Sequence, residues 1–262
     1  MKSFRHALLL IIMPIFWLSL QSEMVNSEPY ITTRYNFSKL WEKLGWPTTK
    51  IGNAEFFLGP IKCGYFNAAW NIRNEEEFKS AQDFFKGNRF YIQHLPDQLD
   101  VNISKWFKTP VTRLEMALDI SSFVFQKDSE EFSIRAVTNE EELNDFAQLF
   151  APAFSLSIDE ALIALKPMST VSTFFVAYYQ DETVGRAQLF IDDHGTAGIW
   201  MVFVKEGFRK QGIGRALTQK CLRLAKDCGA ITAVLNATPP AESLYLKMGF
   251  KPKQLWHLEI MH

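Results

Sequence analysis

The sequence has 262 residues, of which 47% are hydrophobic and 14% aromatic, enough apolar material for one large or two modest domains. Its formal net charge of −1 gives no general attraction to nucleic acid. Three cysteines do not make a disulfide framework, and no cysteine or histidine cluster has the spacing of a metal site. We therefore expect a globular protein that binds neither nucleic acid nor a metal.

Residues 1–27 form an apolar N-terminal extension. Lys2 and Arg5 precede a mostly apolar run over residues 7–20, which is the pattern of a signal peptide. The run is short for a membrane-spanning helix, which needs about 20 apolar residues. The extension is therefore a signal-like segment, an anchor or helix packed on the domain, or a sequence that precedes a true start at Met24. Membrane contact is expected only through residues 7–20.

Residues 28–127 alternate between helical and strand patterns and are expected to form a domain. Apolar residues at helical spacing predict helices over residues 37–44 and 75–85. Strands are predicted over residues 55–58, 65–72 and 90–93, with a further candidate within residues 114–125. A polar linker then leads to a second domain, residues 132–262.

The second domain begins with a strand over residues 132–136, and a helix starts at Asn139. Ser157 and Glu160 have the spacing of a capping box and predict a second helix. Three strands follow, over residues 172–179, 184–191 and 197–204, joined by polar turns at residues 180–183 and 192–195.

A basic loop with two glycines follows the last of these strands, and a helix begins inside it. Gly212 and Gly214 let the backbone approach an anion, while the unpaired amides of a first helical turn attract negative charge. Arg209, Lys210 and Arg215 add positive charge. The pattern predicts a ligand with phosphates, most simply a diphosphate. The alternative is a glycine turn that opens an ordinary surface helix.

The loop differs from two common phosphate-binding motifs. It lacks the Gly-Lys-Ser/Thr of a Walker A loop, and Leu217 stands where a dinucleotide fingerprint needs its third glycine. Cys221 and Cys228 lie on the apolar face of the helix that follows, so both are expected to be small buried hydrophobes. The remaining elements are a strand over residues 230–235, a helix over residues 242–248 opened by Thr238, and a closing strand over residues 253–261.

The string from Arg209 to Gly214 resembles the acyl-CoA loop of the GNAT N-acetyltransferase superfamily. A second stretch, in which Tyr245 precedes the pair Gly249-Phe250, is similar to another signature of that superfamily. The resemblance implies an α/β fold with a mixed sheet, and a GNAT fold in residues 132–262. Fragments at residues 64–70 and 115–120 look like tandem-GNAT proteins with a degenerate N-terminal half. An unrelated small α+β domain is the alternative for residues 28–127.

The resemblance also implies site residues. The strand before the loop is expected to diverge from its neighbour and to pair with the pantetheine arm of acetyl-CoA through Val202, Phe203 and Val204. The residues expected to bind the diphosphate are Arg209, Lys210, Gln211, Gly212, Ile213, Gly214, Arg215 and Ala216. Thr238 stands where the family often has an Asn that contacts the pantetheine arm. Tyr245 occupies the position that protonates the leaving sulfur, and its alternative role is that of a core tyrosine.

No general base is identified, because the strand before the loop carries no acid. Asp193 and His194 lie just before it in a good turn sequence, and Asp159 and Glu160 lie at a helix start. A water chain, or no protein base at all, remains an alternative.

The expected function is acetyl transfer from acetyl-CoA to a primary amine of a small molecule or protein, by direct attack in a ternary complex, without a metal. A cytoplasmic location is expected because acyl-CoA is cytosolic. The alternatives are a non-catalytic acyl-CoA sensor or scaffold, and an exported or membrane-anchored binding protein. Neither the amine acceptor nor the oligomeric state can be derived from the sequence.

Overall fold

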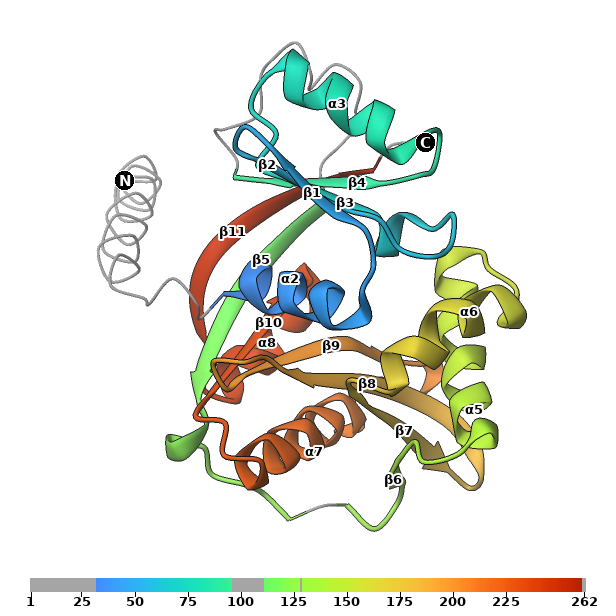
Figure 1. Ribbon diagram of the computed structural model, residues 1–262. Helices are drawn as coiled ribbons and strands as arrows, with labels where there is room; N and C mark the ends of the chain where they lie inside the picture. Colours follow the sequence, from blue (N-terminus) through green and yellow to red (C-terminus); the bar gives the residue numbers. More distant parts are fainter. Residues whose placement is uncertain (1–31, 96–110, 128, 261–262) are drawn as a thin grey trace, which may run out of the picture.

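The computed structural model describes residues 32–95, 111–127 and 129–260 (Figure 1). The interpretations of the apolar extension 1–27 fall outside these residues, as does the start of the predicted first domain. The last residue of the predicted closing strand also lies outside them.

The strands of the described residues form one mixed sheet of 11 strands in the order β1-β2-β3-β4-β11-β5-β10-β9-β8-β7-β6. This arrangement confirms the predicted α/β class with a mixed sheet. The strands are β1 (Thr48–Ile51), β2 (Ala54–Phe57), β3 (Ala68–Trp70), β4 (Tyr91–His94), β5 (Val111–Asp119), β6 (Ser133–Ala136), β7 (Thr173–Tyr179), β8 (Glu182–Ile191), β9 (Thr196–Val204), β10 (Thr232–Ala237) and β11 (Lys251–Ile260).

Helices cover both faces of this sheet (Figure 1). The α-helices of the described residues are α2 (Thr33–Leu44), α3 (Glu75–Phe85), α5 (Glu140–Phe150), α6 (Ile158–Ser169), α7 (Ile213–Asp227) and α8 (Pro239–Lys247). Two of them form crossovers between parallel strands. Helix α3 joins β3 to β4 in the N-terminal half, and α7 joins β9 to β10 in the C-terminal half.

The two halves exchange their last strands. Strand β5 belongs by sequence to the N-terminal half, but it pairs with β10 of the C-terminal half. Strand β11 closes the C-terminal half in sequence, yet it pairs with β4 and β5 and not with β10. In Figure 1 these two long strands run side by side between the two parts of the sheet. The polar linker before residue 132 therefore separates two halves in sequence, while the sheet continues across both.

Alternation along β7 distributes its side chains between two hydrophobic cores, since successive residues of a strand face opposite sides. Phe174, Val176 and Tyr178 face the core under α2, α5 and α6, while Phe175 and Ala177 face the core under α7 and α8. The first core also contains N-terminal side chains, including Phe37, Trp41, Phe57, Phe66 and Trp70. The halves thus share a core as well as a sheet.

Helix α2 is anchored to the C-terminal half by the side chain of Asn36. Its amide nitrogen donates to the Asp192 carboxylate and to the Thr196 carbonyl oxygen, each at 3.0 Å. Its amide oxygen accepts from the indole of Trp200 at 2.9 Å. A Cβ on Gly198 would overlap both Asn36 and Trp200, so this close approach requires glycine.

Most predicted elements are present, with local corrections. The predicted strand over residues 65–72 is wrong in its first part, which is a 3-10 turn at Gly64–Phe66 followed by β3. Asn67 ends that turn by donating to the Ile61 and Arg89 carbonyl oxygens. Strand β5 stops at Asp119, whose carboxylate accepts from the Ser121 amide and starts another 3-10 turn. Strand β1 was not predicted, because it is short and mostly exposed.

Candidate functional site

Strands β9 and β10 separate partway along their length. Their parallel pairing runs from Thr196 and Thr232 to Gly198 and Val234, whereas β9 continues to Val204. Beyond Gly198 the backbone edge of β9 has no partner on β10, so it can pair with an extended ligand. The predicted divergence of the strand before the loop is therefore present. Val202, Phe203 and Val204 all lie on the diverged segment and are partly exposed.

A β-bulge shapes the diverged segment. The register between β8 and β9 shifts between Arg186 and Gln188, and Met201 has a positive φ of 53°. The buried guanidinium of Arg186 donates to the Met201 carbonyl oxygen at 2.6 Å and to the Leu149 carbonyl oxygen at 3.2 Å. Burial lowers the pKa of Arg186 to about 10, which still leaves it charged at neutral pH. This cation fixes the bulge from inside the core.

The predicted phosphate loop leads directly into the N-terminus of α7. Gly212 is the N-cap with a φ of 86° and makes no side-chain cap hydrogen bond, and no acidic residue lies in the first turn. The first amides of a helix have no partner within it, so they remain available to an anion. The amide of Ala216 is an exception, because it already donates to the Gly212 carbonyl oxygen at 3.0 Å.

The other polar residues of the loop are partly engaged. Arg209 donates through Nε to the Val204 carbonyl oxygen at 3.2 Å, and Gln211 donates to the Gly207 carbonyl oxygen at 3.2 Å. Arg215 differs from them, since its Nε is buried and makes no hydrogen bond with the described residues. Arg215 and Lys247 line a shallow hollow of about 300 Å³ together with residues of the segment 118–126. These basic groups and the uncapped helix fit a phosphate-bearing ligand.

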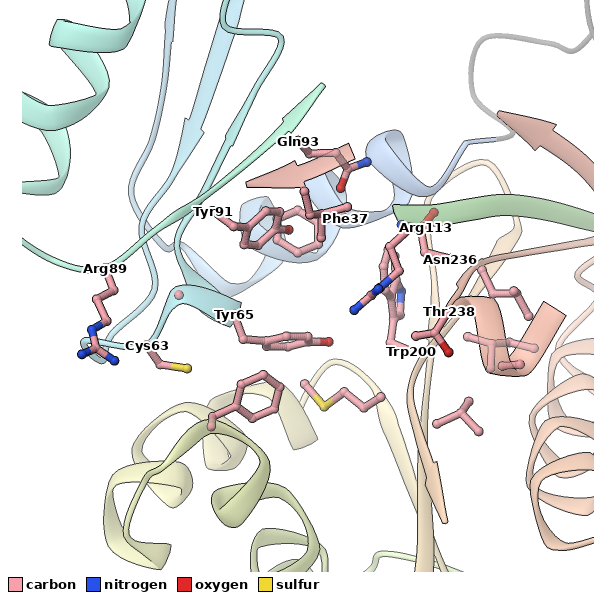
Figure 2. A pocket seen from close by; sticks show the side chains of 18 of the residues that line it. Phe37, Cys63, Tyr65, Arg89, Tyr91, Gln93, Arg113, Trp200, Asn236 and Thr238 are labelled. Carbon is pink, nitrogen blue, oxygen red and sulfur yellow. The ribbon is translucent and has the colours of Figure 1, made fainter. Parts of the chain in front are cut away.

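A cavity of about 410 Å³ opens beside the diverged strands, between the two halves of the chain (Figure 2). It is lined from the C-terminal half by Phe154, Ile199, Trp200, Met201, Val202, Leu235, Asn236, Thr238, Ala241, Tyr245 and Leu258. From the N-terminal half it is lined by Phe37, Lys62, Cys63, Gly64, Tyr65, Arg89, Tyr91, Gln93 and Arg113. Figure 2 shows Arg89 and Cys63 at one end and Asn236 and Thr238 at the other.

Two predicted residues, Tyr245 and Thr238, lie at this cavity. Tyr245 is buried on α8, and burial raises the pKa of its hydroxyl, an effect partly offset by a hydrogen bond with Thr218. Thr238 is the N-cap of α8 as predicted, but its side chain makes no cap hydrogen bond and instead lines the cavity. Asn236, two residues earlier, supplies an amide at the same end of the cavity.

The base candidates do not line the cavity. Asp193 lies in a turn, where it accepts from the Tyr35 hydroxyl at 3.1 Å and pairs with Lys39 at 3.3 Å. The ring of His194 lies 5.2 Å from that of Tyr35. Glu160 closes the capping box with Ser157, as predicted, and Asp159 lies in the same first turn of α6. Asp193, His194 and Glu160 thus have structural contacts away from the cavity.

Sequence reasoning missed most of the cavity wall. Arg113, Tyr65 and Tyr91 come from separate elements of the N-terminal half and meet only in the folded chain. The one signal in the sequence was a basic residue, Arg113, in a segment with strand character. Asn236, two positions before Thr238, is not among the residues that the sequence predicts for the site.

Neither a metal site nor a membrane span is evident in the part of the chain that the structure describes. No group of three or more His, Cys, Asp or Glu side chains in those residues could hold a metal ion. No single helix there is long and apolar enough to cross a membrane. A pair of helices, Glu140–Phe154 and Ile158–Ser169, passes that test by length and composition, but it is bent by 119°.

Comparison with known proteins supports a GNAT likeness for part of the chain. Residues 141–250 match the model of the acetyltransferase (GNAT) family. No curated protein is a significant match to the sequence. Among solved structures, a GCN5-related N-acetyltransferase from Kribbella flavida is similar with a TM-score of 0.65 at 14% identity, covering 87% of this chain and 94% of that one.

Two further structures extend the likeness over nearly the whole chain. A GCN5-related N-acetyltransferase-like protein from Streptococcus suis has a TM-score of 0.62 at 12% identity, covering 92% of this chain and 100% of that one. A tandem GNAT protein from the clavulanic acid biosynthesis pathway has a TM-score of 0.55 at 12% identity, covering 94% and 93%. Residues 141–250 thus match the GNAT family model, the solved structures share the fold, and the predicted resemblance to GNAT proteins is confirmed.

Proposed function

We propose that this chain is an acetyl-CoA-dependent N-acetyltransferase that acts on a primary amine. The observation that carries this proposal is the divergence of β9 from β10 directly before an uncapped, basic helix N-terminus. The match of residues 141–250 to the GNAT family model supports acyl transfer from an acyl-CoA. In this proposal residues 132–262 are the catalytic domain and residues 28–127 a degenerate GNAT-like domain. The location is cytoplasmic, where acetyl-CoA is found, with membrane association or export through residues 7–20 as the alternative.

Each part of the donor has a group that fits it. The amides of Gln211 to Arg215, with Arg209 and Lys210, would bind the diphosphate of CoA. The free backbone edge at Val202–Val204 would pair with the pantetheine arm. Thr238 and Asn236 would contact the end of that arm, where the thioester enters the cavity.

The reaction needs a neutral amine and a departing thiolate. The amine nitrogen attacks the thioester carbon, an N–C bond forms, and the C–S bond breaks. Tyr245 would donate a proton to the sulfur, and its raised pKa keeps it protonated at neutral pH. No Asp, Glu or His is among the described residues that line the cavity. The extra proton of the amine would therefore leave to water, and binding the reactants together would supply much of the acceleration.

The test is acetyl transfer itself. The full chain would be incubated with acetyl-CoA and a panel of primary amines, and the products analysed by mass spectrometry for the acetyl mass shift. We expect transfer to at least one amine, with release of one thiol for each acetyl group transferred. A chain that binds CoA in calorimetry but acetylates no amine would instead be a non-catalytic acyl-CoA sensor. The observation that favours this alternative is the lack of an Asp, Glu or His in the described cavity lining.

A further inference from the structure

The cavity has an excess of positive charge. Its described lining contains three cationic residues, Lys62, Arg89 and Arg113, and no Asp or Glu. All three come from the N-terminal half, whereas the C-terminal half supplies the groups proposed to hold the thioester. Low-dielectric walls strengthen the field of unbalanced charges in a cleft. The cavity therefore favours an anionic group on whatever molecule fills it.

Arg113 is the cation placed to bind such a group directly. It is half-buried on β5, and Figure 2 shows its guanidinium pointing into the cavity toward Tyr65. One nitrogen donates to the Thr112 carbonyl oxygen at 2.9 Å. No carboxylate among the described residues forms an ion pair with it. A guanidinium has five N–H donors, so several remain for a ligand.

The surroundings of Arg113 are those of a charge that lacks a counterion. Burial lowers its pKa, and the nearby hydroxyls of Tyr91 and Tyr65 act in the opposite direction. A half-buried cation without a counterion costs free energy that a bound anion would recover. Arg113 with two phenol hydroxyls offers several donors to one planar anion, and arginine binds carboxylates in a bidentate manner.

A fourth group supports a ligand at this place. Gln93 on β4 lines the cavity and is 2% exposed, and its amide nitrogen has no hydrogen-bond partner among the described residues. Buried amides are normally paired, so an orphaned donor in a cavity wall indicates a missing acceptor. The rest of the wall includes the aromatic rings of Phe37, Phe154 and Trp200, which suit an apolar body.

We propose that the acceptor amine also carries a carboxylate, as an amino acid does, and that Arg113 binds this carboxylate beside Tyr65 and Tyr91. The inference rests on the proposed acetyl transfer and specifies its acceptor. The same chemistry would suit an acyl donor that ends in a carboxylate, such as succinyl-CoA. We assign the carboxylate to the acceptor because the cations and Gln93 come from the N-terminal half, whereas Thr238 and Tyr245, the groups proposed to hold the donor, come from the C-terminal half.

The first experiment compares amines that differ only in the carboxylate: L-phenylalanine with 2-phenylethylamine, and L-lysine with 1,5-diaminopentane. Rates are corrected for the neutral fraction of each amine. We expect kcat/KM with acetyl-CoA to be about 10²-fold higher for the carboxylates, since a site built to bind a polar group rejects an analogue that lacks it. Equal rates within each pair would overturn the inference and leave the acetyltransferase proposal intact.

The second experiment uses Arg113→Gln and Arg113→Lys, with Arg135→Gln on the exposed part of β6 as the control. Arg113→Gln should raise KM for the amino acid about 10²-fold and leave CoA affinity unchanged, with partial recovery in Arg113→Lys. An unchanged KM in Arg113→Gln would overturn the inference. Retained CoA affinity shows that the variant is folded.

Two further measurements complete the test. One distinguishes a carboxylate on the acceptor from a carboxylate on the acyl donor, and the other distinguishes the carboxylate site from the proposed catalysis. A higher kcat/KM for succinyl-CoA than for acetyl-CoA that depends on Arg113 would overturn the assignment to the acceptor. Calorimetric titration of L-phenylalanine into the CoA complex needs no turnover. Binding that Arg113→Gln weakens would support the carboxylate site even if no amine is acetylated, and in that case only the proposed catalysis fails.

Discussion

The two crossovers of this sheet, β3-α3-β4 and β9-α7-β10, have the same topology, but they differ in the pairing of their strands and in the start of their helix. In the N-terminal half, β3 and β4 are paired along the whole of β3. The helix between them, α3, starts with an Asn74 side chain that caps the Glu77 amide at 2.9 Å. Its first turn carries Glu75, Glu76 and Glu77. Strands β9 and β10 diverge instead, and α7 starts at an uncapped Gly212 with no acid in its first turn.

This difference shows what turns a crossover into a binding site. A capped, acidic helix start satisfies its own amides and repels phosphate, so the start of α3 does not suit an anion. An uncapped start after a basic loop leaves its donors to a ligand. The N-terminal half contributes to the site in another way, because its exchanged strand β5 carries Arg113 to the cavity beside β10.

The largest expected effect concerns Tyr245, which lies in the C-terminal half beside the diverged strands. Tyr245→Phe removes only the hydroxyl, and losing a general acid costs about 10²–10⁴-fold in rate. Steady-state kinetics should show kcat reduced by this amount with acetyl-CoA binding nearly intact. The control is Tyr178→Phe, which removes a hydroxyl that donates to Asp145 at 2.8 Å outside the cavity. A kcat within about twofold of wild type would make Tyr245 a packing residue.

The second prediction is the pH dependence of transfer. Neither half provides an acid or histidine to the described cavity lining, so the neutral fraction of the free amine should control the rate. For an alkyl amine with a pKa near 10, kcat/KM should rise about tenfold per pH unit from pH 6 to 8, or about 10²-fold in total. The raised pKa of Tyr245 predicts no loss of the acid in that range, because a group with a raised pKa keeps its proton to higher pH.

An acceptor with a lower pKa serves as the control for this profile. Its rise should level off at a correspondingly lower pH, because the profile follows the amine. A plateau near pH 7 that stays in place for both amines would show that a protein base acts, and would refute this account of proton loss.

The third prediction tests the contrast between the two helix starts. Gly212→Asp puts a negative charge and a side chain at the start of α7, so CoA affinity should fall at least tenfold, about 1.4 kcal/mol. Gly229→Asp at the other end of α7 is the matched control. The two glycines have φ values of 86° and 84°, and a Cβ at either would meet nothing within 4 Å. Both variants thus carry the same backbone strain.

Calorimetry measures both variants and the stoichiometry together. We expect one CoA per chain, because the acidic start of α3 does not suit a diphosphate. Unchanged affinity in a folded Gly212→Asp chain would remove this loop from the site. Two equivalent sites per chain would contradict the difference drawn between α3 and α7.

The sequence predicts local features of this molecule well and long-range ones poorly. Gly212 and Tyr245 belong to contiguous signatures, and the Ser157 capping box spans four residues, so each could be derived from neighbours in the chain. The exchange of β5 and β11 depends on pairing between strands more than 100 residues apart, and no local pattern encodes it. The cavity wall around Arg113 depends on that exchange, which is why its chemistry appears only in the structure.

The smallest expected effect concerns Glu115, where the two halves join. This carboxylate lies on β5 opposite Asn236 of β10, and its Oε2 accepts from the Thr33 hydroxyl at 2.7 Å and the Trp256 indole at 3.1 Å. Burial raises its pKa above the ordinary value, although these hydrogen bonds act in the opposite direction. A raised folded-state pKa means that the folded chain binds the proton more tightly than the unfolded chain.

The contribution of Glu115 is therefore fully present below its unfolded pKa and is lost as the pH rises through its folded pKa. Glu115→Gln removes the charge and keeps an oxygen for both donors, so near pH 5 its free energy of unfolding should match wild type within about 1 kcal/mol. The variant should then gain stability relative to wild type as the pH rises to 8. Urea unfolding across this range measures the difference, with the exposed Glu131→Gln as a control that should show no trend. If the stability of Glu115→Gln relative to wild type fell with pH, the pKa of Glu115 would not be raised in the folded chain.

Each chain should unfold in one transition, because the exchanged strands and the shared core join the halves. Two separate transitions would show that the halves are less coupled than the continuous sheet requires.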